Sequence, residues 1–121
     1  MSVLTGLRVA QLGDGLAAAV CGRLFADAGA TVGVVGASRA TPLEEYLNHG
    51  KEPSEIAGAD LIVTEGGPAA LRRSGYDVAS LRMLNPLAAI VLISPYGQVG
   101  PQADDPATDL TLICASGIAR L

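Results

Sequence analysis

Short apolar runs alternate along the chain with segments that have a helical pattern. Runs rich in Val, Ile, Leu and Ala, each ended by Gly, Pro or polar residues, predict strands at residues 7–12, 30–35, 59–64 and 88–93. Apolar residues occupy most positions of each run instead of every second one, which is typical of parallel strands covered on both faces. The pattern therefore favours a parallel sheet buried between helices.

Helical segments fill the intervals between these runs. An alanine-rich segment at 16–28 is followed by Gly29, a residue suited to end a helix. Thr41 and Pro42 are typical of a helix start, because Thr caps free N–H groups and Pro is tolerated at the first position. Further helices are expected at 42–47, 68–73 and 78–84 and from Pro106 or Ala107 onward, with a polar connector at 51–58. We therefore predict one α/β domain over residues 1–121, a Rossmann-like three-layer sandwich with a mainly parallel sheet of at least four strands.

Composition narrows the class of protein. Half of the residues are hydrophobic and 17% are charged, with a mean hydropathy of +0.40, which is high for a solitary domain and suggests surface meant for a partner. No apolar run approaches the ~18 residues of a membrane helix, and the N-terminus has no signal-peptide pattern. A net charge of −4 without a basic stripe argues against nucleic acid. Cys21 and Cys114 lack metal-ligand spacing, so we expect no metal site, and we expect buried, reduced thiols in a cytoplasmic protein.

The turn after the first predicted strand carries the first candidate site. Residues 13–18 read Gly-Asp-Gly-Leu-Ala-Ala, a G-x-G-x-x-A pattern between a strand and a helix. In that context the glycines let the backbone approach a pyrophosphate, and the helix N-terminus offers unpaired N–H groups. Gly13, Asp14, Gly15 and Ala17 are therefore candidate cofactor-binding residues. Asp14 would stand where an anion binds, however, and as an N-cap it would satisfy the helix itself.

Two later turns supply candidate phosphate contacts. NAD-binding domains place an acid about 20 residues further on to hold a ribose hydroxyl, whereas this chain has Gly, Ala, Ser and then Arg39 at 36–39. Arg39 suits instead the phosphate of NADP or of a 3′-phosphorylated nucleotide such as CoA. After the third strand, Glu65 precedes a helix with Arg73, which either reaches a phosphate or is solvated near the helix end. A structural turn, CoA-type binding and NAD(P) binding all remain open. Three acids predict weak binding of any polyanion: Asp14, Glu44 and Glu65.

The segment 84–117 carries the most specific pattern. It reads LNPLAAIVLISPYGQVGPQADDPATDLTLICASG, an apolar run that opens into a Ser-Pro-Tyr-Gly-Gln loop and then a helical Ser-Gly ending. It resembles the class III CoA-transferase family, the CaiB/BaiF group, whose members carry LNP…S-x-x-G-Q-x-G-P…P-x-x-D-L…S-G. Weaker likenesses follow one another in the family's order upstream, at 6–9, 22–30, 47–51 and 59–68.

The resemblance implies an N-terminal Rossmann-like domain that holds CoA, in a protein whose two chains interlock. It implies transfer of CoA from an acyl-CoA to another carboxylic acid through an aspartyl intermediate, or racemisation of 2-methylacyl-CoAs. The chain stops at Leu121, before the segment where the family carries its catalytic aspartate. We therefore expect no catalytic residue, no required cofactor and at most weak binding of CoA. The expected partners are acyl-CoA or CoA, a second copy of the chain, and the rest of a larger CoA-transferase.

This chain departs from the family at ligand positions. Gly36 follows Val35 where members usually have Glu, and Glu65 stands where an Asn is common. Lost polar contacts and added acids should weaken the binding of CoA, since each charge-assisted hydrogen bond contributes roughly 1.5–3 kcal/mol. The alternatives are a non-catalytic scaffolding or dimerisation domain and, less favoured, a small NAD(P)-binding domain. Residues 111–115 are apolar around most of the last helix, so we expect the chain to self-associate.

Overall fold

The computed structural model describes residues 2–36 and 41–120. Five strands form one sheet in the order β3-β2-β1-β4-β5, and every neighbouring pair is parallel. The strands are β1 (Arg8–Leu12), β2 (Thr31–Val35), β3 (Glu52–Pro53), β4 (Leu61–Glu65) and β5 (Ala89–Ile93). The predicted α/β class and the parallel sheet of at least four strands are confirmed.

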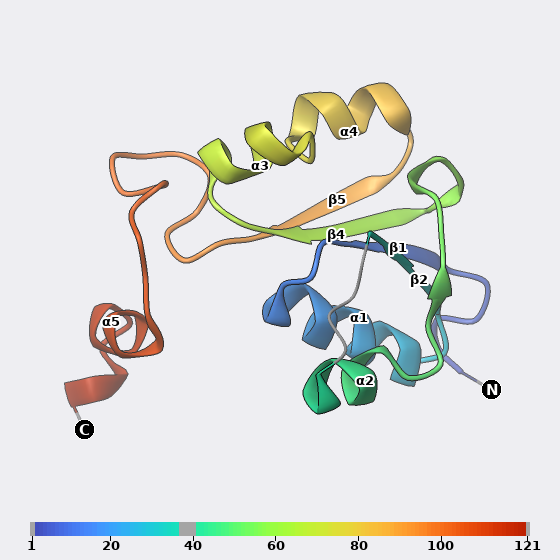
Figure 1. Ribbon diagram of the computed structural model, residues 1–121, viewed down its shortest axis with the longest axis horizontal. Coiled ribbons are helices and arrows are strands. Elements are labelled where there is room, and N and C mark those ends of the chain that lie inside the picture. The colour runs from blue at the N-terminus through green and yellow to red at the C-terminus, as the bar shows by residue number, and fades with distance from the viewer. Residues whose placement is uncertain (1, 37–40, 121) are drawn as a thin grey trace.

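Helices cover the sheet on both faces and give the predicted three layers (Figure 1). On one face lie α1 (Leu16–Asp27) and α2 (Pro42–Asn48), and on the other lie α3 (Pro68–Ser74) and α4 (Val78–Leu84). The local signals act as expected: Thr41 caps α2 in a capping box with Glu44, and Gly29, with φ +97°, follows α1. Arg23 and Asp27 form an ion pair of 2.9 Å along α1.

The segment 51–58, predicted as a polar connector, contains two short elements. Strand β3 pairs with the edge of β2, with Glu52 opposite Gly33 and Pro53 opposite Val34, and a 3-10 turn follows at Ile56–Gly58. An edge strand tolerates Pro because one side of its backbone has no partner strand. Gly33 lets β3 approach, since a side chain at that position would collide with Ser54. The sequence gives no strand signal here because the strand is two residues long and polar.

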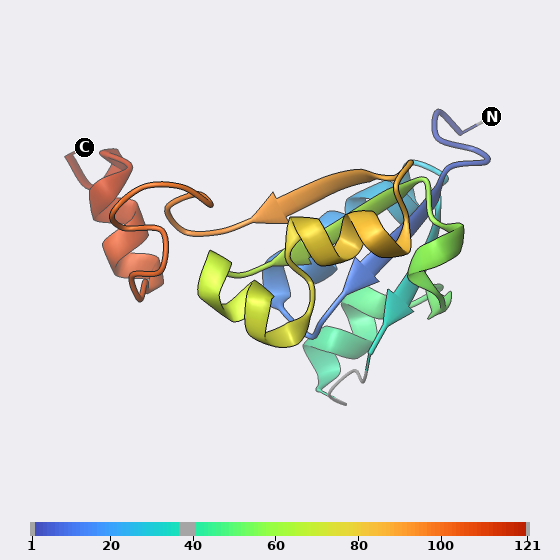
Figure 2. The ribbon, with the colours of Figure 1, turned by 90° about the horizontal axis from the view of Figure 1, so that it is seen from above.

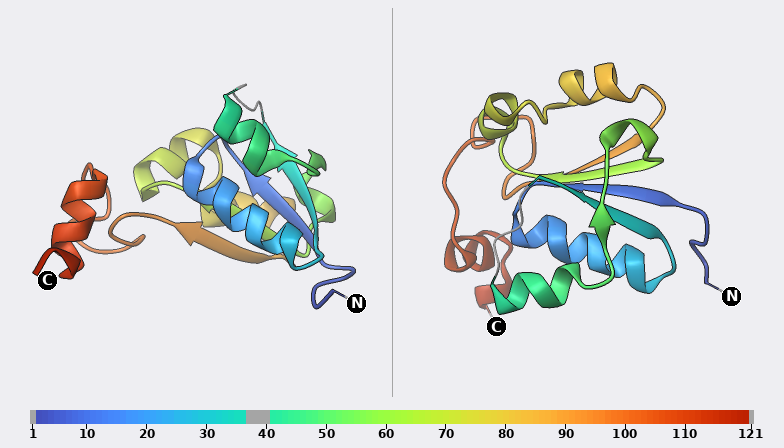
Figure 3. Two further views of the ribbon diagram at one scale, coloured as in Figure 1. Left: turned by 90° about the horizontal axis from the view of Figure 1, so that it is seen from below. Right: turned by 45° about the vertical axis from the view of Figure 1, so that its right-hand side comes forward.

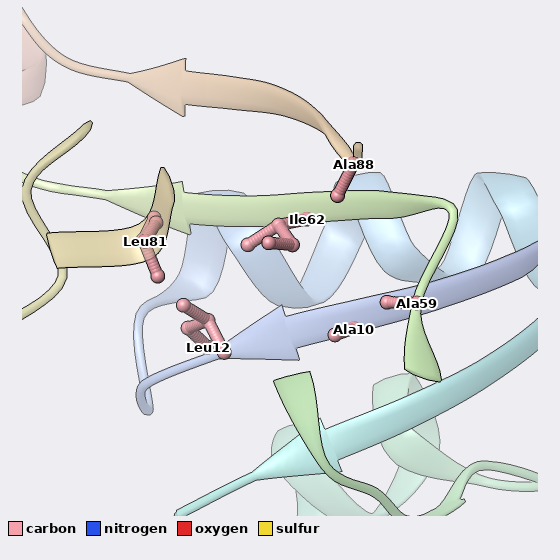
Figure 4. Packing of buried hydrophobic residues seen from close by; sticks show 6 residues of the cluster. All are labelled: Ala10, Leu12, Ala59, Ile62, Leu81 and Ala88. Atoms are coloured by element: carbon pink, nitrogen blue, oxygen red, sulfur yellow. The ribbon is translucent and has the colours of Figure 1, made fainter. Parts of the chain in front are cut away.

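The core consists of two clusters, one on each face of the sheet. Because alternate residues of a strand face opposite ways, Val9 of β1 belongs to the cluster under α1, whereas Ala10 and Leu12 belong to the cluster under α4. Figure 4 shows the second cluster, in which Leu81 of α4 and Ile62 of β4 are both fully buried. The small aliphatic residues that make the composition apolar thus pack helices closely against the sheet.

Asn85, in the Leu-Asn-Pro run, is one of the few buried polar residues. Its Nδ2 donates to the carbonyls of Ile56 at 2.9 Å and Ala59 at 2.7 Å, and its Oδ1 accepts from the N–H of Ala88 at 3.2 Å. One side chain therefore ties the start of β5 to the turn that leads into β4. The most specific part of the family-like sequence begins with a structural clamp.

The last helix, α5 (Asp109–Ala115), stands clear of the sheet at the end of a long loop (Figures 2 and 3). It begins at Asp109, later than the predicted Pro106 or Ala107, because Thr108 forms a capping box with Thr111. Leu110 is 70% exposed and Ile113 43%. The expectation of two buried thiols was wrong, since Cys114 on this helix is exposed and Cys21 is half-buried. None of the helices within 2–36 and 41–120 is long and apolar enough to cross a membrane.

Candidate ligand-binding cleft

The carboxyl edge of the sheet is the natural place for a site in this topology. From β1 the chain moves outward to β2 and β3, and it then crosses back to the other side of β1 to form β4 and β5. In open α/β sheets, ligands bind at the carboxyl ends of the two strands where the order reverses in this way. Here those ends lead into Gly13 after β1 and into Glu65 at the end of β4. The sequence-predicted residues therefore cluster around the switch point.

A cleft of about 900 Å³ opens at this edge, between the start of α1, the turn into α3, the loop after β5 and α5. Of the predicted residues, Ala17, Glu65 and Arg73 line it. Gly13, Asp14 and Gly15 line instead a smaller pocket of about 180 Å³ on the α2 side of the same turn. Arg39 lies outside the described residues, so its predicted role stays a prediction. The structure thus brings the predicted residues that it describes to one edge of the sheet, where they line two separate pockets.

The N-terminus of α1 is capped from another strand. The N-cap residue is Gly15, in extended conformation and without a side-chain cap, so the expectation that Asp14 would act as the N-cap is wrong. Glu65 supplies the cap instead, since its Oε2 accepts from the N–H of Ala18 at 2.5 Å. Gly15 makes room for it, because a side chain there would collide with the carboxyl group of Glu65. A carboxylate of the chain itself therefore occupies the helix end that the glycine pattern suggested for a phosphate.

Gly13 has a different role in the same turn. Its φ of +79° lies in the left-handed region, which only glycine adopts without strain. Its N–H donates to the carbonyl of Val35 at 3.3 Å, which continues the pairing of β1 with β2. The N–H of Gly13, one of the candidate phosphate donors, is therefore used in pairing the two strands. The N–H of Ala18 is the one bound by a carboxylate. The sequence does not predict this contact, because the partner Glu65 is 47 residues away.

The loop after β5 contributes two contacts that the sequence did not indicate. Asp104 accepts through its Oδ1 from the N–H of Ala69 at 2.7 Å and so caps α3. Gln98, from the Ser-Pro-Tyr-Gly-Gln run, donates through Nε2 to the carbonyl of Gly66 at 2.9 Å. Both contacts fasten the loop to the turn after β4. They give the cleft a fixed wall.

The charges around the cleft are unevenly distributed. Arg73, in the last turn of α3, is the single basic residue among the described residues that line it. Four acids face it or rim it, from β4, the loop and α5: Glu65, Asp104, Asp105 and Asp109. The floor is apolar, with Leu16, Val20 and Leu24 of α1. The cleft therefore suits an apolar group better than a polyanion. Within the described parts of the chain, no three His, Cys, Asp or Glu side chains gather as a metal site would require.

Lys51, the last residue of the Leu-Asn-x-Gly-Lys run, lies beneath the smaller pocket. Its Nζ donates to Oε1 of Gln11 at 2.6 Å, to the carbonyl of Ala19 at 2.9 Å and to Oδ1 of Asn48 at 3.0 Å. Burial, helped by the nearby Arg23, lowers the pKa of Lys51 to about 8. All three ammonium donors are engaged within the protein. Lys51 therefore joins β1, α1 and α2 and leaves no donor for a ligand.

Known proteins show what this arrangement is similar to. The sequence model of CoA-transferase family III matches residues 56–121, more than half of the chain. Over 96% of its length the chain is 26% identical to cinnamoyl-CoA:phenyllactate CoA-transferase of Clostridium sporogenes, and over 95% it is 27% identical to a CaiB/baiF CoA-transferase family protein of Caenorhabditis elegans. It spans only 36% and 38% of those two proteins.

Solved structures agree with the sequence comparison. A CAIB/BAIF family protein from Brucella suis superposes with a TM-score of 0.77 at 25% identity, over 97% of this chain and 40% of that one. A hypothetical protein of Mycobacterium tuberculosis shares the fold, with a TM-score of 0.76 at 22% identity over 98% of this chain and 40% of that one. The match over 56–121, which includes the loop and clamp described above, makes the assignment: the chain belongs to CoA-transferase family III.

Proposed function

We propose that this chain contributes the CoA-facing side of a family III CoA-transferase site and holds CoA or an acyl-CoA weakly. The observation that carries the proposal is the cleft of about 900 Å³ at the switch point of a family III fold. Its apolar floor suits the pantetheine and acyl parts of such a ligand, and Arg73, which lines the same cleft, is the proposed phosphate contact.

Weak binding is part of the proposal. Glu65, Asp104, Asp105 and Asp109 place negative charge around one arginine, and like charges at short range oppose a polyanion. One amide donor at the start of each helix beside the cleft is already used, that of Ala18 in α1 by Glu65 and that of Ala69 in α3 by Asp104. What remains to attract CoA is apolar area together with Arg73, and with Arg39 if that residue reaches the site as the sequence predicts.

Titration calorimetry with CoA and with NADP tests the assignment. We expect CoA to bind with a dissociation constant above the micromolar range, and NADP to bind more weakly. Arg73→Ala should weaken CoA binding about tenfold, because a charge-assisted contact is lost, whereas Arg72→Ala serves as the matched control, since Arg72 does not line the cleft. Submicromolar binding of CoA that survives Arg39→Ala together with Arg73→Ala would show that the phosphate contacts are misassigned.

These 121 residues should not transfer CoA by themselves. None of their aspartates matches the position at which the family carries its nucleophile, and Asp104, near the cleft, is engaged in capping α3. The measurement is exchange of label between an acyl-CoA and a free carboxylic acid. Exchange above background by the purified chain would contradict the expectation.

A second role, scaffolding through self-association, is favoured by α5. This helix stands clear of the sheet (Figure 2) and presents Leu110 and Ile113 to solvent, so an apolar surface remains to be covered. We propose that a second copy, or the rest of a larger CoA-transferase, covers it. We also propose a cytoplasmic location, supported by two free thiols, Cys21 and Cys114, one of them exposed.

A further inference from the structure

The contact between Glu65 and α1 joins the end of β4 to the turn after β1, two parts of the chain that lie far apart in the sequence. Helix α1 has 12 residues and no side-chain cap of its own at Gly15, so the partial positive charge of its first N–H groups needs an acceptor. Glu65 reaches it from the end of β4, and its Oε2 lies 2.5 Å from the nitrogen of Ala18. The group bound at this helix end is thus a carboxylate supplied by the protein.

Gly15 shows that the turn is shaped around this carboxylate. Its φ is −76° and its ψ 144°, an ordinary extended conformation that any residue adopts. Conformation therefore does not require glycine at position 15. Space does, because an added Cβ would overlap Cδ and Cγ of Glu65. In a dinucleotide fingerprint the second glycine lets the backbone approach the pyrophosphate; in this chain the group that approaches is Glu65.

We infer that Glu65 is a specificity-determining residue, an internal anion that occupies the Ala18 N–H at the N-terminus of α1 and opposes the binding of phosphate and carboxylate groups there. A ligand phosphate would have to displace Glu65 from Ala18 and would meet its charge as well. The cleft therefore takes a ligand by its uncharged part and directs anionic groups toward Arg73, which lines the same cleft on α3. For CoA this inference rests on the proposed function; for a simple phosphate it does not.

Three variants separate the parts of this contact. Glu65→Ala removes the carboxylate and opens the space beside Gly15. Glu65→Gln keeps the size and an acceptor for Ala18 but removes the charge. Asp105→Ala is the matched control, because Asp105 is an acid that lines the same cleft, whereas the carboxylate that binds the start of α1 is that of Glu65. Thermal melting first establishes that each variant folds.

The probe is inorganic pyrophosphate, followed through the amide resonance of Ala18 by NMR, with CoA titrated in parallel. We expect Glu65→Ala to bind pyrophosphate about tenfold more tightly than the unaltered chain, with Glu65→Gln between them, since the N-terminus of a helix favours an anion. Pyrophosphate should shift the Ala18 resonance in Glu65→Ala and leave it unmoved in the unaltered chain. Asp105→Ala should change the affinity less than about threefold, as removal of one exposed charge does.

The pyrophosphate and CoA titrations test the role of Glu65 and the proposed function separately. Equal affinities of the unaltered chain and Glu65→Ala for pyrophosphate, or an equal gain in Asp105→Ala, would overturn the inference, because general charge would then explain the result. Should Glu65→Ala fail to fold, Glu65→Gln decides, and no gain in that variant would overturn it. If pyrophosphate behaves as expected while CoA binds to no variant, the role of Glu65 stands and the proposed function fails.

Discussion

At the scale of single residues, Asn85 is the strongest candidate for a purely structural role. Its side chain satisfies the buried carbonyl of Ala59, the half-buried carbonyl of Ile56 and the buried N–H of Ala88, and a buried group left without a partner costs about 1–3 kcal/mol. We expect Asn85→Ala to lower the free energy of unfolding by about 3 kcal/mol in urea denaturation. Gln102→Ala, in an exposed turn, should change it by less than about 0.5 kcal/mol. A loss below 1 kcal/mol in Asn85→Ala would show that the clamp is dispensable.

Lys51 makes stability depend on pH. Its pKa is about 8 in the folded protein against an ordinary value of 10.5, so between these values the unfolded chain binds more protons than the folded one. Unfolding is therefore disfavoured increasingly as the pH rises through this window, and stability should increase from pH 8 upward. Below pH 8 both states are protonated, and the burial penalty is constant. Melting temperatures of the unaltered chain and of Lys51→Met between pH 7.5 and 9.5 test this, because the rise should vanish in the variant.

At the scale of elements, the stability of the turn from β1 into α1 should depend on the space between Gly15 and Glu65. Gly15→Ala has an allowed conformation but collides with Glu65, so we expect a loss of about 1–3 kcal/mol. The same substitution in a Glu65→Ala background should be nearly neutral, because the colliding group is gone. A double-mutant cycle by chemical denaturation measures this coupling. Independent, additive effects would mean that Glu65 does not fill the space beside Gly15 in solution.

Gly13→Ala supplies the matched control for this turn. Nothing lies within 4 Å of the added Cβ, but the residue has φ +79°, a conformation that costs a non-glycine residue roughly 1–2 kcal/mol. Its effect should therefore be the same with and without Glu65. A dependence on Glu65 at position 13 would indicate that the whole turn rearranges when the carboxylate is removed.

The elements that could be predicted from sequence are those whose signals are local. Thr41 and Pro42 start α2 by their own chemistry, and Gly29 follows α1 for the same reason. The features that could not be predicted depend on partners far along the chain. The edge strand at Glu52–Pro53 exists because β2 is beside it, and Glu65 and Asp104 cap helices to which no sequence spacing connects them. The shape of the candidate site depends on such long-range contacts. The sequence could therefore indicate which residues lie at the site, but not which of their groups remain available to a ligand.

At the scale of the whole molecule, the residues that identify the family are those that hold the scaffold together. Asn85 clamps the start of β5, Gln98 fastens the following loop, and Lys51 joins three elements. This explains why motifs in family order predicted the architecture well. It also explains why they say little about the ligand, since the residues at the cleft, Glu65 above all, are those in which the chain differs from the pattern.

At this scale too, the exposed apolar side chains of α5 predict that the chain self-associates. Helix α5 stands apart from the sheet, with Leu110 and Ile113 exposed, while Leu16, Val20 and Leu24 of α1 expose apolar surface on the main body. Apolar surface of this extent is rarely left uncovered on a monomer, and a symmetric dimer covers both parts at once. We expect a dimer in sedimentation velocity at tens of micromolar, and Leu110→Asp with Ile113→Asp should shift it to monomer.

The control for that experiment is Leu87→Asp, because Leu87 is 95% exposed and lies outside both the cleft and α5. It should leave the dimer intact, because Leu87 lies outside the proposed dimer interface. An intact dimer would show that loss of an exposed apolar side chain alone does not cause dissociation. A clean monomer of the unaltered chain at the same concentration would contradict the prediction. If α5 then folds back onto its own cleft, the Val20 and Leu24 amides will be protected from solvent exchange in the unaltered chain but not in the α5 variant. The two outcomes thus assign the apolar face of α5 either to a second copy or to the cleft that it borders.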